Sequence, residues 1–158
     1  MSVRLRRTST LISVALEEHF AGKRSRARNP EAAQPEQIEL PLVARRIVEA
    51  HTLIFKQGDP AKSYYVVASG KLVARRQHRP NLKSVSKVIS TGELFIYNCD
   101  GSHAADCYAP FESIVWAIDR RWLNSAAQRH LGLTAVLHSI HAAELTMILE
   151  SYRAPLIN

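Results

Sequence analysis

The residues between Gly92 and Ala109, GELFIYNCDGSHAADCYA, gather the side chains most able to do chemistry in this 158-residue chain. The stretch contains three acidic residues, two cysteines and one histidine, but no lysine or arginine. It begins as a ligand-binding loop would, yet it lacks a cation that could neutralise an anionic ligand. Because a buried anion without a partner is very costly, the question is what this loop can bind.

The two cysteines, Cys99 and Cys107, flank an expected turn and have His103 between them. Two thiols and an imidazole could form an incomplete metal or redox site. The other interpretation is that the thiols are partly buried and fill gaps in the core. Two cysteines do not make a disulfide framework, so we expect no disulfide scaffold, no metal and no cofactor.

Other candidates for chemistry are weak. His138 and His141 are three residues apart on an expected helix, as metal-binding pairs are, but no cysteine or carboxylate accompanies them at matching spacing, which favours a surface pair. Ser102 and His103 are neighbours on an expected strand, where successive side chains point to opposite faces, so they are not a catalytic pair. We expect no catalytic residues and no enzyme.

The net charge of +7 is concentrated at one end of the chain. Residues 1–30 contain seven basic and two acidic residues, whereas the other 128 residues contain 14 basic and 12 acidic ones. A basic tail could contact nucleic acid or anionic lipid, or it could be a solvated, poorly ordered end. We find no signal peptide and no apolar run near the ~20 residues of a membrane span, so we expect a cytoplasmic protein without membrane contact.

The chain divides into three parts. Residues 1–41 predict a basic tail with a short helix and a proline-containing linker, and residues 154–158 predict a short tail. Between them, residues 42–153 predict one domain. Its strand-sized runs are separated by turn residues, which is typical of a small β-barrel or roll. These runs are residues 64–70, 71–77 and 84–90, and Ser113 to Ile118.

The pattern changes from strands to helices near Arg120. Residues 120–130 predict a short helix, and residues 131–155 predict a long helix that ends at Pro155. Apolar residues recur in the long helix at alternating spacings of four and three, which is typical of a coiled-coil seam. The candidate seam residues are Val136, Ile140, Ala143 and Met147. The alternative is a helix that packs on its own β domain.

The stretch IFKQGDPAKSYYVVASGKLV resembles the hallmark block of the cyclic-nucleotide-binding β-roll, and STGELF and SIVWAIDRRWL follow in the family's order. The resemblance covers about residues 43–153 and is nearest to the cAMP receptor protein and fumarate-nitrate regulator group, with its FixK-like branch. It implies a mainly β fold with α: an antiparallel β-roll (a double-stranded β-helix, or cupin-like jelly roll) and a long C-terminal dimerisation helix. It also places Gly58 and Gly70 at tight turns.

The resemblance implies a ligand site as well. Family members that bind cAMP use a Gly-Glu pair for the ribose and an arginine some ten residues later for the phosphate. The ligand-pocket candidates here are Gly92, Glu93, Leu94, Ser102 and His103. His103 falls at the arginine's place, and because imidazole is mostly neutral at pH 7, we predict that cAMP does not bind. Backbone N–H groups alone could still bind an anion, so a small-molecule or cyclic-nucleotide sensor is the alternative.

The expected function is therefore a regulatory or sensor module that forms a homodimer. Regulators of this group continue past the long helix into a helix-turn-helix, whereas this sequence has three residues after Pro155. We therefore expect no direct sequence-specific DNA binding by this chain. Heterodimers with full-length family regulators are a further expectation, in which the short chain would act as an inhibitor.

Overall fold

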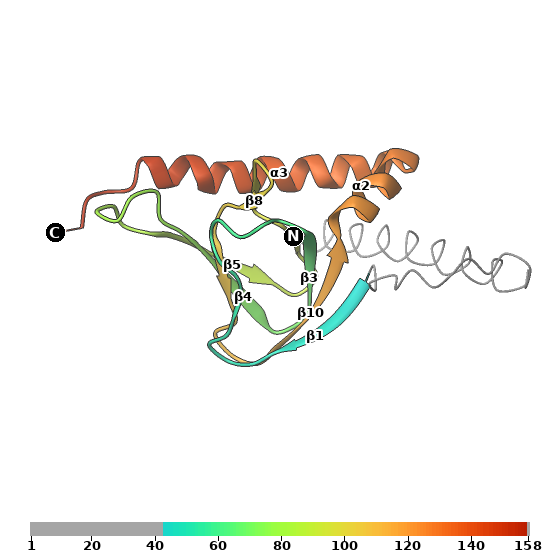
Figure 1. The fold of residues 1–158 in the computed structure, drawn as a ribbon, viewed down its shortest axis with the longest axis horizontal. Helices are drawn as coiled ribbons and strands as arrows, with labels where there is room; N and C mark the ends of the chain where they lie inside the picture. The colour runs from blue at the N-terminus through green and yellow to red at the C-terminus, as the bar shows by residue number, and fades with distance from the viewer. Residues whose placement is uncertain (1–42, 158) are drawn as a thin grey trace, which may run out of the picture.

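The structure, a computed structural model, describes residues 43–157 as a roll of short antiparallel strands with one long helix across it (Figure 1). The strands are β1 (Val43–Val48), β2 (Leu53–Phe55), β3 (Ser63–Ser69), β4 (Lys71–Arg76), β5 (Val85–Ser90), β6 (Leu94–Phe95), β7 (Asn98–Cys99), β8 (Ser102–His103), β9 (Asp106–Tyr108) and β10 (Ser113–Asp119). The helices are α2 (Arg120–Arg129) and α3 (Leu131–Tyr152). The predicted tail helix and linker in residues 1–41 lie outside the described residues.

The strands form two four-stranded antiparallel sheets and one hairpin. The sheet orders are β1-β10-β3-β6 and β2-β9-β4-β5, and β7 pairs with β8. The predicted antiparallel roll is confirmed, and the expected strands over residues 64–70, 71–77 and 84–90 appear as β3, β4 and β5. The cupin-like jelly roll is only a loose description, because the β7–β8 hairpin stands apart from both sheets.

Two glycines make the turns that the sequence predicts. Gly58 and Gly70 have φ angles of 96° and 93°, a conformation that side chains disfavour. Gly70 joins β3 to β4, and a Cβ at this position would overlap the side chain of Ser113 on β10. Gly70 therefore permits both the turn and the close approach of β10.

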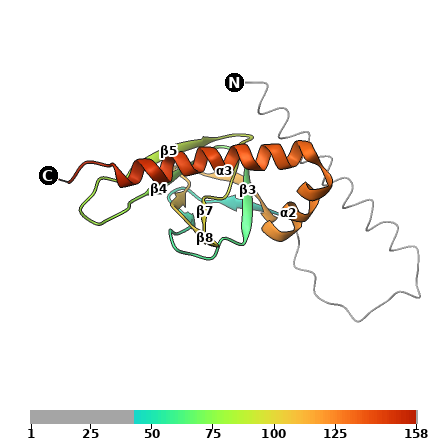
Figure 2. The same ribbon diagram turned by 90° about the horizontal axis from the view of Figure 1, so that it is seen from above.

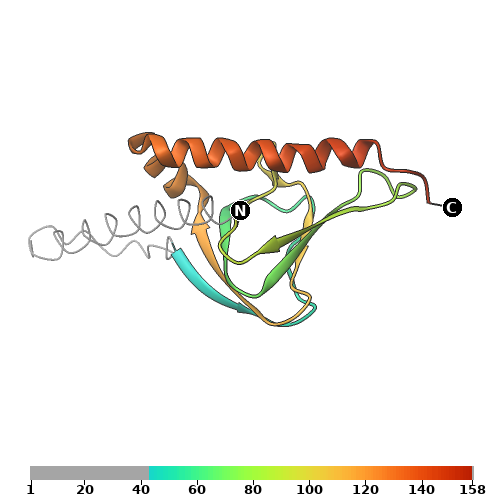
Figure 3. The same cartoon turned by 180° about the vertical axis from the view of Figure 1, so that it is seen from behind.

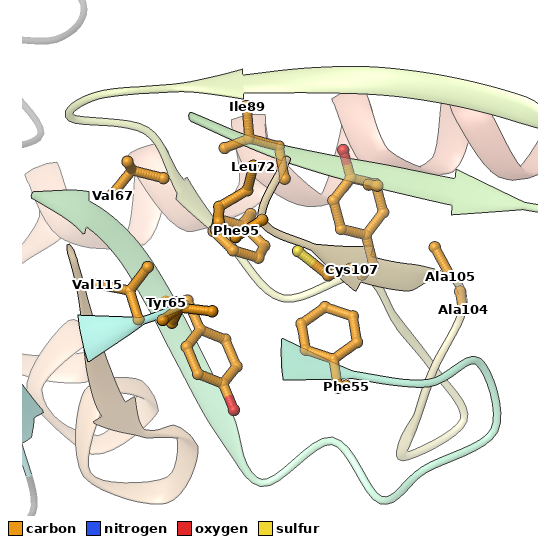
Figure 4. Packing of buried hydrophobic residues seen from close by; sticks show 14 of the residues in the cluster. Phe55, Tyr65, Val67, Leu72, Ile89, Phe95, Ala104, Ala105, Cys107 and Val115 are labelled. Carbon is orange, nitrogen blue, oxygen red and sulfur yellow. The ribbon is translucent and has the colours of Figure 1, made fainter. Parts of the chain in front are cut away.

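Aromatic rings fill the interior of the roll (Figure 4). The ring centroid of Phe55 lies 5.6 Å from that of Tyr65 and 6.2 Å from that of Phe95, and the Tyr65 and Phe95 centroids are 5.7 Å apart. Aliphatic side chains from β3, β4, β5 and β10 complete this cluster. A second buried cluster lies under the two helices and includes Tyr64, Leu94, Ile118, Leu123, Leu133 and Leu137.

Helix α3 extends along the roll with one face buried (Figures 2 and 3). Its buried residues are Leu133, Leu137, Glu144, Met147, Ile148 and Ser151. Apolar residues also lie on the opposite, exposed face, among them Leu145 and Leu149. A helix that is apolar on two opposite faces has more apolar surface than its own roll can cover.

By length and composition alone, α3 could cross a membrane. It is the one such helix in residues 43–157, with 22 residues and a mean hydropathy of 1.3 over the best window, of which 28% is buried. The sequence analysis found no such run because histidines and glutamates interrupt it. A helix that packs on a soluble core can pass the same test, and α3 contributes to both core clusters, so this feature is weak evidence for a span.

Candidate functional site

The ligand-pocket candidates lie in residues 92–104, which we name the loop segment. Its start is fixed to β3: the Gly92 N–H donates to the Val67 carbonyl at 2.7 Å, and the Val67 N–H donates to the Glu93 carbonyl at 3.3 Å. Glu93 itself is half-buried. Leu94 is buried in the second cluster and contributes to the core rather than to an open pocket.

His103 lies inside the roll, with 4% of its surface exposed. Its ring stacks on Phe55 at 3.6 Å between centroids and 8° between planes. Its Nδ1 lies 2.7 Å from the Ile96 carbonyl oxygen, which can only accept, so Nδ1 carries the proton. Burial lowers the pKa of His103, although the Ile96 carbonyl opposes this shift. His103 is thus a neutral ring that is part of the core.

The five candidates form two groups. Gly92, Glu93 and Leu94 lie against β3, whereas Ser102 and His103 pair with the loop before β3. Ser102 is half-buried while His103 is buried, as expected for neighbours on opposite faces of a strand. A hollow of about 730 Å³ lies elsewhere and is lined by Gln57, Arg75, Gln77, Lys83, Ser84, Asp106 and Ile157. None of the five candidates lines this hollow.

Glu144 of α3 is a residue of the site that the sequence analysis missed. Its Oε1 accepts from the Ile96 N–H and its Oε2 from the Tyr97 N–H, both at 2.8 Å. Only 5% of Glu144 is exposed. Burial raises its pKa to about 7, although the backbone hydrogen bonds lower it. The only signal in the sequence is a glutamate that falls on the buried stripe of an apolar helix.

Arg76 of β4 is the second missed residue, and it is also buried. Its Nε donates to Ser151 Oγ at 2.9 Å, and its Nη1 donates to the Ala104 carbonyl at 2.6 Å. The guanidinium lies 5.9 Å from the ring centroid of Tyr152. Arg76 is distant from the loop segment in sequence, and the pairing of β4 with β9 brings it close.

The four residues of the predicted dimer seam differ in their burial within one chain. Met147 is buried in the core of the roll, and Ile140 packs against the second cluster. Val136 is half-buried, and only Ala143 is exposed. The four residues therefore do not form a surface stripe. A buried helix face and a dimer seam repeat at nearly the same spacing, so the sequence pattern alone could not distinguish them.

The prediction that His138 and His141 form a surface pair holds for His138 only. His138 is exposed, but His141 is half-buried, and its Nε2 lies 3.1 Å from the Tyr64 hydroxyl. Desolvation lowers the pKa of His141, and the charge of His138 adds to this effect. No group of three or more His, Cys, Asp or Glu residues within residues 43–157 could hold a metal ion.

The two cysteines differ sharply in their surroundings. Cys107 is fully buried in the roll, and burial raises the pKa of its thiol to about 12. Cys99 is exposed on the β7–β8 hairpin. Cys107 therefore matches the interpretation of a cysteine that fills the core, whereas Cys99 does not.

A thiol reagent such as Ellman's reagent should modify one cysteine of the native protein quickly and the other only after denaturation. Burial and the raised pKa both suppress the thiolate of Cys107, so we expect its rate to be lower by at least ~100-fold. The Cys99→Ser variant should lose the fast phase and keep the slow one. Equal rates for both thiols in the native protein would contradict this assignment.

Comparisons with known proteins identify the class of domain. Residues 45–130 match the family described as the cyclic nucleotide-binding domain, and since this match covers more than half of the chain, the chain belongs to that family. No protein with a curated description matches it. Several hundred solved structures resemble it, among them transcription regulators of the group that the loop segment and the glycine turns suggested.

Three of these solved structures illustrate the likeness. The catabolite activator protein of Thermus thermophilus is 26% identical, with 73% of this chain and 56% of that chain covered and a TM-score of 0.57. FixK2 of Bradyrhizobium japonicum is 18% identical, with 68% of this chain and 55% of that chain covered and a TM-score of 0.59. The sensor domain of the transcriptional regulator DNR of Pseudomonas aeruginosa is 17% identical, with 68% of this chain and 75% of that chain covered and a TM-score of 0.55.

The match to the first two structures spans only a little over half of their length. The chain therefore contains a cyclic nucleotide-binding domain and is similar to part of such regulators. The predicted resemblance and fold class are confirmed.

Proposed function

We propose that this chain is a regulatory module that pairs with a second copy through α3 and works without a cyclic nucleotide. The observation that carries the proposal is an exposed and mainly apolar stripe on α3, which we name the outer stripe. It consists of Leu131, His138, Leu145 and Tyr152 at intervals of seven residues, with Ala135, Ala142 and Leu149 between them. All seven residues are exposed.

The outer stripe has the spacing of a coiled-coil seam. Alternating steps of four and three residues keep one face of a helix toward a partner helix over three heptads. Leu131 is 89% exposed and Leu149 is 55% exposed, although both are large apolar residues. Contiguous exposed apolar surface of this kind is typical of an interaction site. A second copy of α3 would cover it, and so would the corresponding helix of a related regulator.

The chemistry of the loop segment supports the absence of a nucleotide. A cyclic phosphate needs a cation or several free N–H donors when it is buried. His103, at the position where the resemblance predicts the arginine, is a buried neutral ring, and the Ile96 and Tyr97 N–H groups already donate to Glu144. The alternative, which family membership favours, is a domain that does bind a cyclic nucleotide in the roll.

Calorimetry with cAMP and cGMP tests this choice. We expect no binding with a dissociation constant below about 10 μM, which corresponds to ~7 kcal/mol. Either nucleotide binding more tightly than this would support the alternative function.

A further inference from the structure

Two backbone N–H groups of the loop segment donate to the same carboxylate. The N–H groups of Ile96 and Tyr97 are consecutive in the chain, and both reach the carboxylate of one residue. Tyr97 has a φ angle of 51°, a left-handed conformation that bulky residues rarely adopt. Adjacent N–H groups that point to one place form a concave donor site for an anion. The loop segment therefore contains an anion site made of backbone N–H groups, although it has no lysine or arginine of its own.

Glu144 fills this site from α3. Each carboxylate oxygen accepts one of the two N–H groups at 2.8 Å, a normal length for a hydrogen bond from N–H to oxygen. Among residues 43–157, no lysine or arginine forms an ion pair with Glu144, so the backbone amides are its partners. Glu144 is 5% exposed and accepts from both N–H groups, so neither group is free to bind a second anion.

We propose that Glu144 is a built-in ligand of the roll, whose carboxylate takes the place of an external anion at the Ile96 and Tyr97 amides and couples α3 to the loop segment. This inference deepens the proposed function, on which it rests, because it explains how α3 can be held in place without a bound nucleotide. It also makes Glu144 the residue that decides whether the site accepts an anion from solution.

Arg76 also couples the loop segment to α3, at the last residue of the segment, Ala104. Its guanidinium joins the Ala104 carbonyl to Ser151, which lies two helical turns after Glu144 on α3. The loop segment is thus joined to the roll and α3 at two points, at Ile96 and Tyr97 through N–H donors and at Ala104 through a carbonyl acceptor. Both junctions are made by side chains of this chain.

Nuclear magnetic resonance of the full chain labelled with ¹⁵N tests the proposal. In the wild type, inorganic phosphate and cAMP should leave the amide resonances of Ile96 and Tyr97 unchanged. In the Glu144→Ala variant, sodium acetate, a carboxylate that fits the vacated space, should shift these two resonances saturably and raise the melting temperature. Glu150→Ala, on the exposed side of α3, is the matched control and should show neither effect.

Two results would overturn the proposal. One is a saturable shift of the Ile96 and Tyr97 resonances by phosphate or cAMP in the wild type. The other is a folded Glu144→Ala variant that does not respond to acetate. If Glu144→Ala does not fold, the wild-type titration decides: unchanged resonances support the proposal and shifted ones refute it. Sedimentation of the same samples separates the two proposals, since a monomeric wild type would count against pairing and leave the amide result standing.

Discussion

The Leu149→Glu variant is expected to be a monomer at concentrations where the wild type is a dimer. Leu149 is exposed in the single chain, so the substitution should leave the fold intact. In a pair formed through the outer stripe, the new carboxylate would be buried without a partner, which costs several kcal/mol. Because each 1.4 kcal/mol changes a dissociation constant about tenfold, we expect dimer affinity to fall by at least ~100-fold. Sedimentation velocity measures the change.

Ala143→Glu is the matched control for this experiment. Ala143 is also exposed, but it belongs to the seam predicted from the sequence and lies off the outer stripe. We expect Ala143→Glu to remain dimeric. The opposite pattern, a monomeric Ala143→Glu and a dimeric Leu149→Glu, would show that the partner contacts the other side of α3. Ile140→Glu would not distinguish the two, because Ile140 packs against the second core cluster.

The second large effect concerns the pH dependence of stability. The pKa of Glu144 is about 7 in the folded protein and 4.5 for the unperturbed side chain. Between these values the folded state binds more protons than the unfolded state, so the contribution of Glu144 is complete below about pH 4.5 and is lost as pH rises through 7. The shift corresponds to about 3 kcal/mol of unfolding free energy.

Comparison with Glu144→Gln isolates this contribution, because glutamine has the same size and does not titrate. Urea denaturation of both proteins from pH 4.5 to 8, at one fixed protein concentration, gives the difference in unfolding free energy. We expect the wild type to lose about 3 kcal/mol relative to Glu144→Gln over this range. A difference that stays constant within ~0.5 kcal/mol would mean that Glu144 does not titrate as a buried group.

Other titrating groups make this comparison necessary. Tyr64 on β3 and Tyr97 in the loop segment lie near Glu144. Burial first, and the charge of Glu144 second, raise the pKa of both phenols, so neither phenol titrates in this range. Lys87 on β5 lowers the pKa of Glu144. Burial lowers the pKa of His103 and of His141 on α3, so their contribution is lost as pH falls and opposes the trend from Glu144.

The fold was largely predictable because it depends on local patterns. Strands β3, β4, β5 and β10 are runs of β-branched and aromatic residues between turn residues, and Gly58 and Gly70 mark two of the turns. The two-residue strands β6, β7 and β8 were not predicted individually. They are too short to show a periodicity, and their pairing depends on β3 and on each other.

The candidate site was predictable only in part. The position of the loop segment follows from the Gly92-Glu93 pair. The missing cation follows from the absence of lysine and arginine between Lys87 and Arg120. The two side chains that hydrogen-bond to the backbone of the segment are distant in the sequence. Glu144 is 48 residues beyond Ile96, and Arg76 is 28 residues before Ala104. No local pattern predicts such contacts, since they exist only once α3 lies on the roll.

The measurement that tests the central claim most directly is sedimentation of the purified chain with and without cAMP. The account predicts a dimer at about 10 μM protein, with the same sedimentation coefficient when cAMP is added at about 1 mM. A monomer at about 100 μM would contradict pairing through α3. A monomer that becomes a dimer when cAMP is added would contradict the claim that the module works without a cyclic nucleotide.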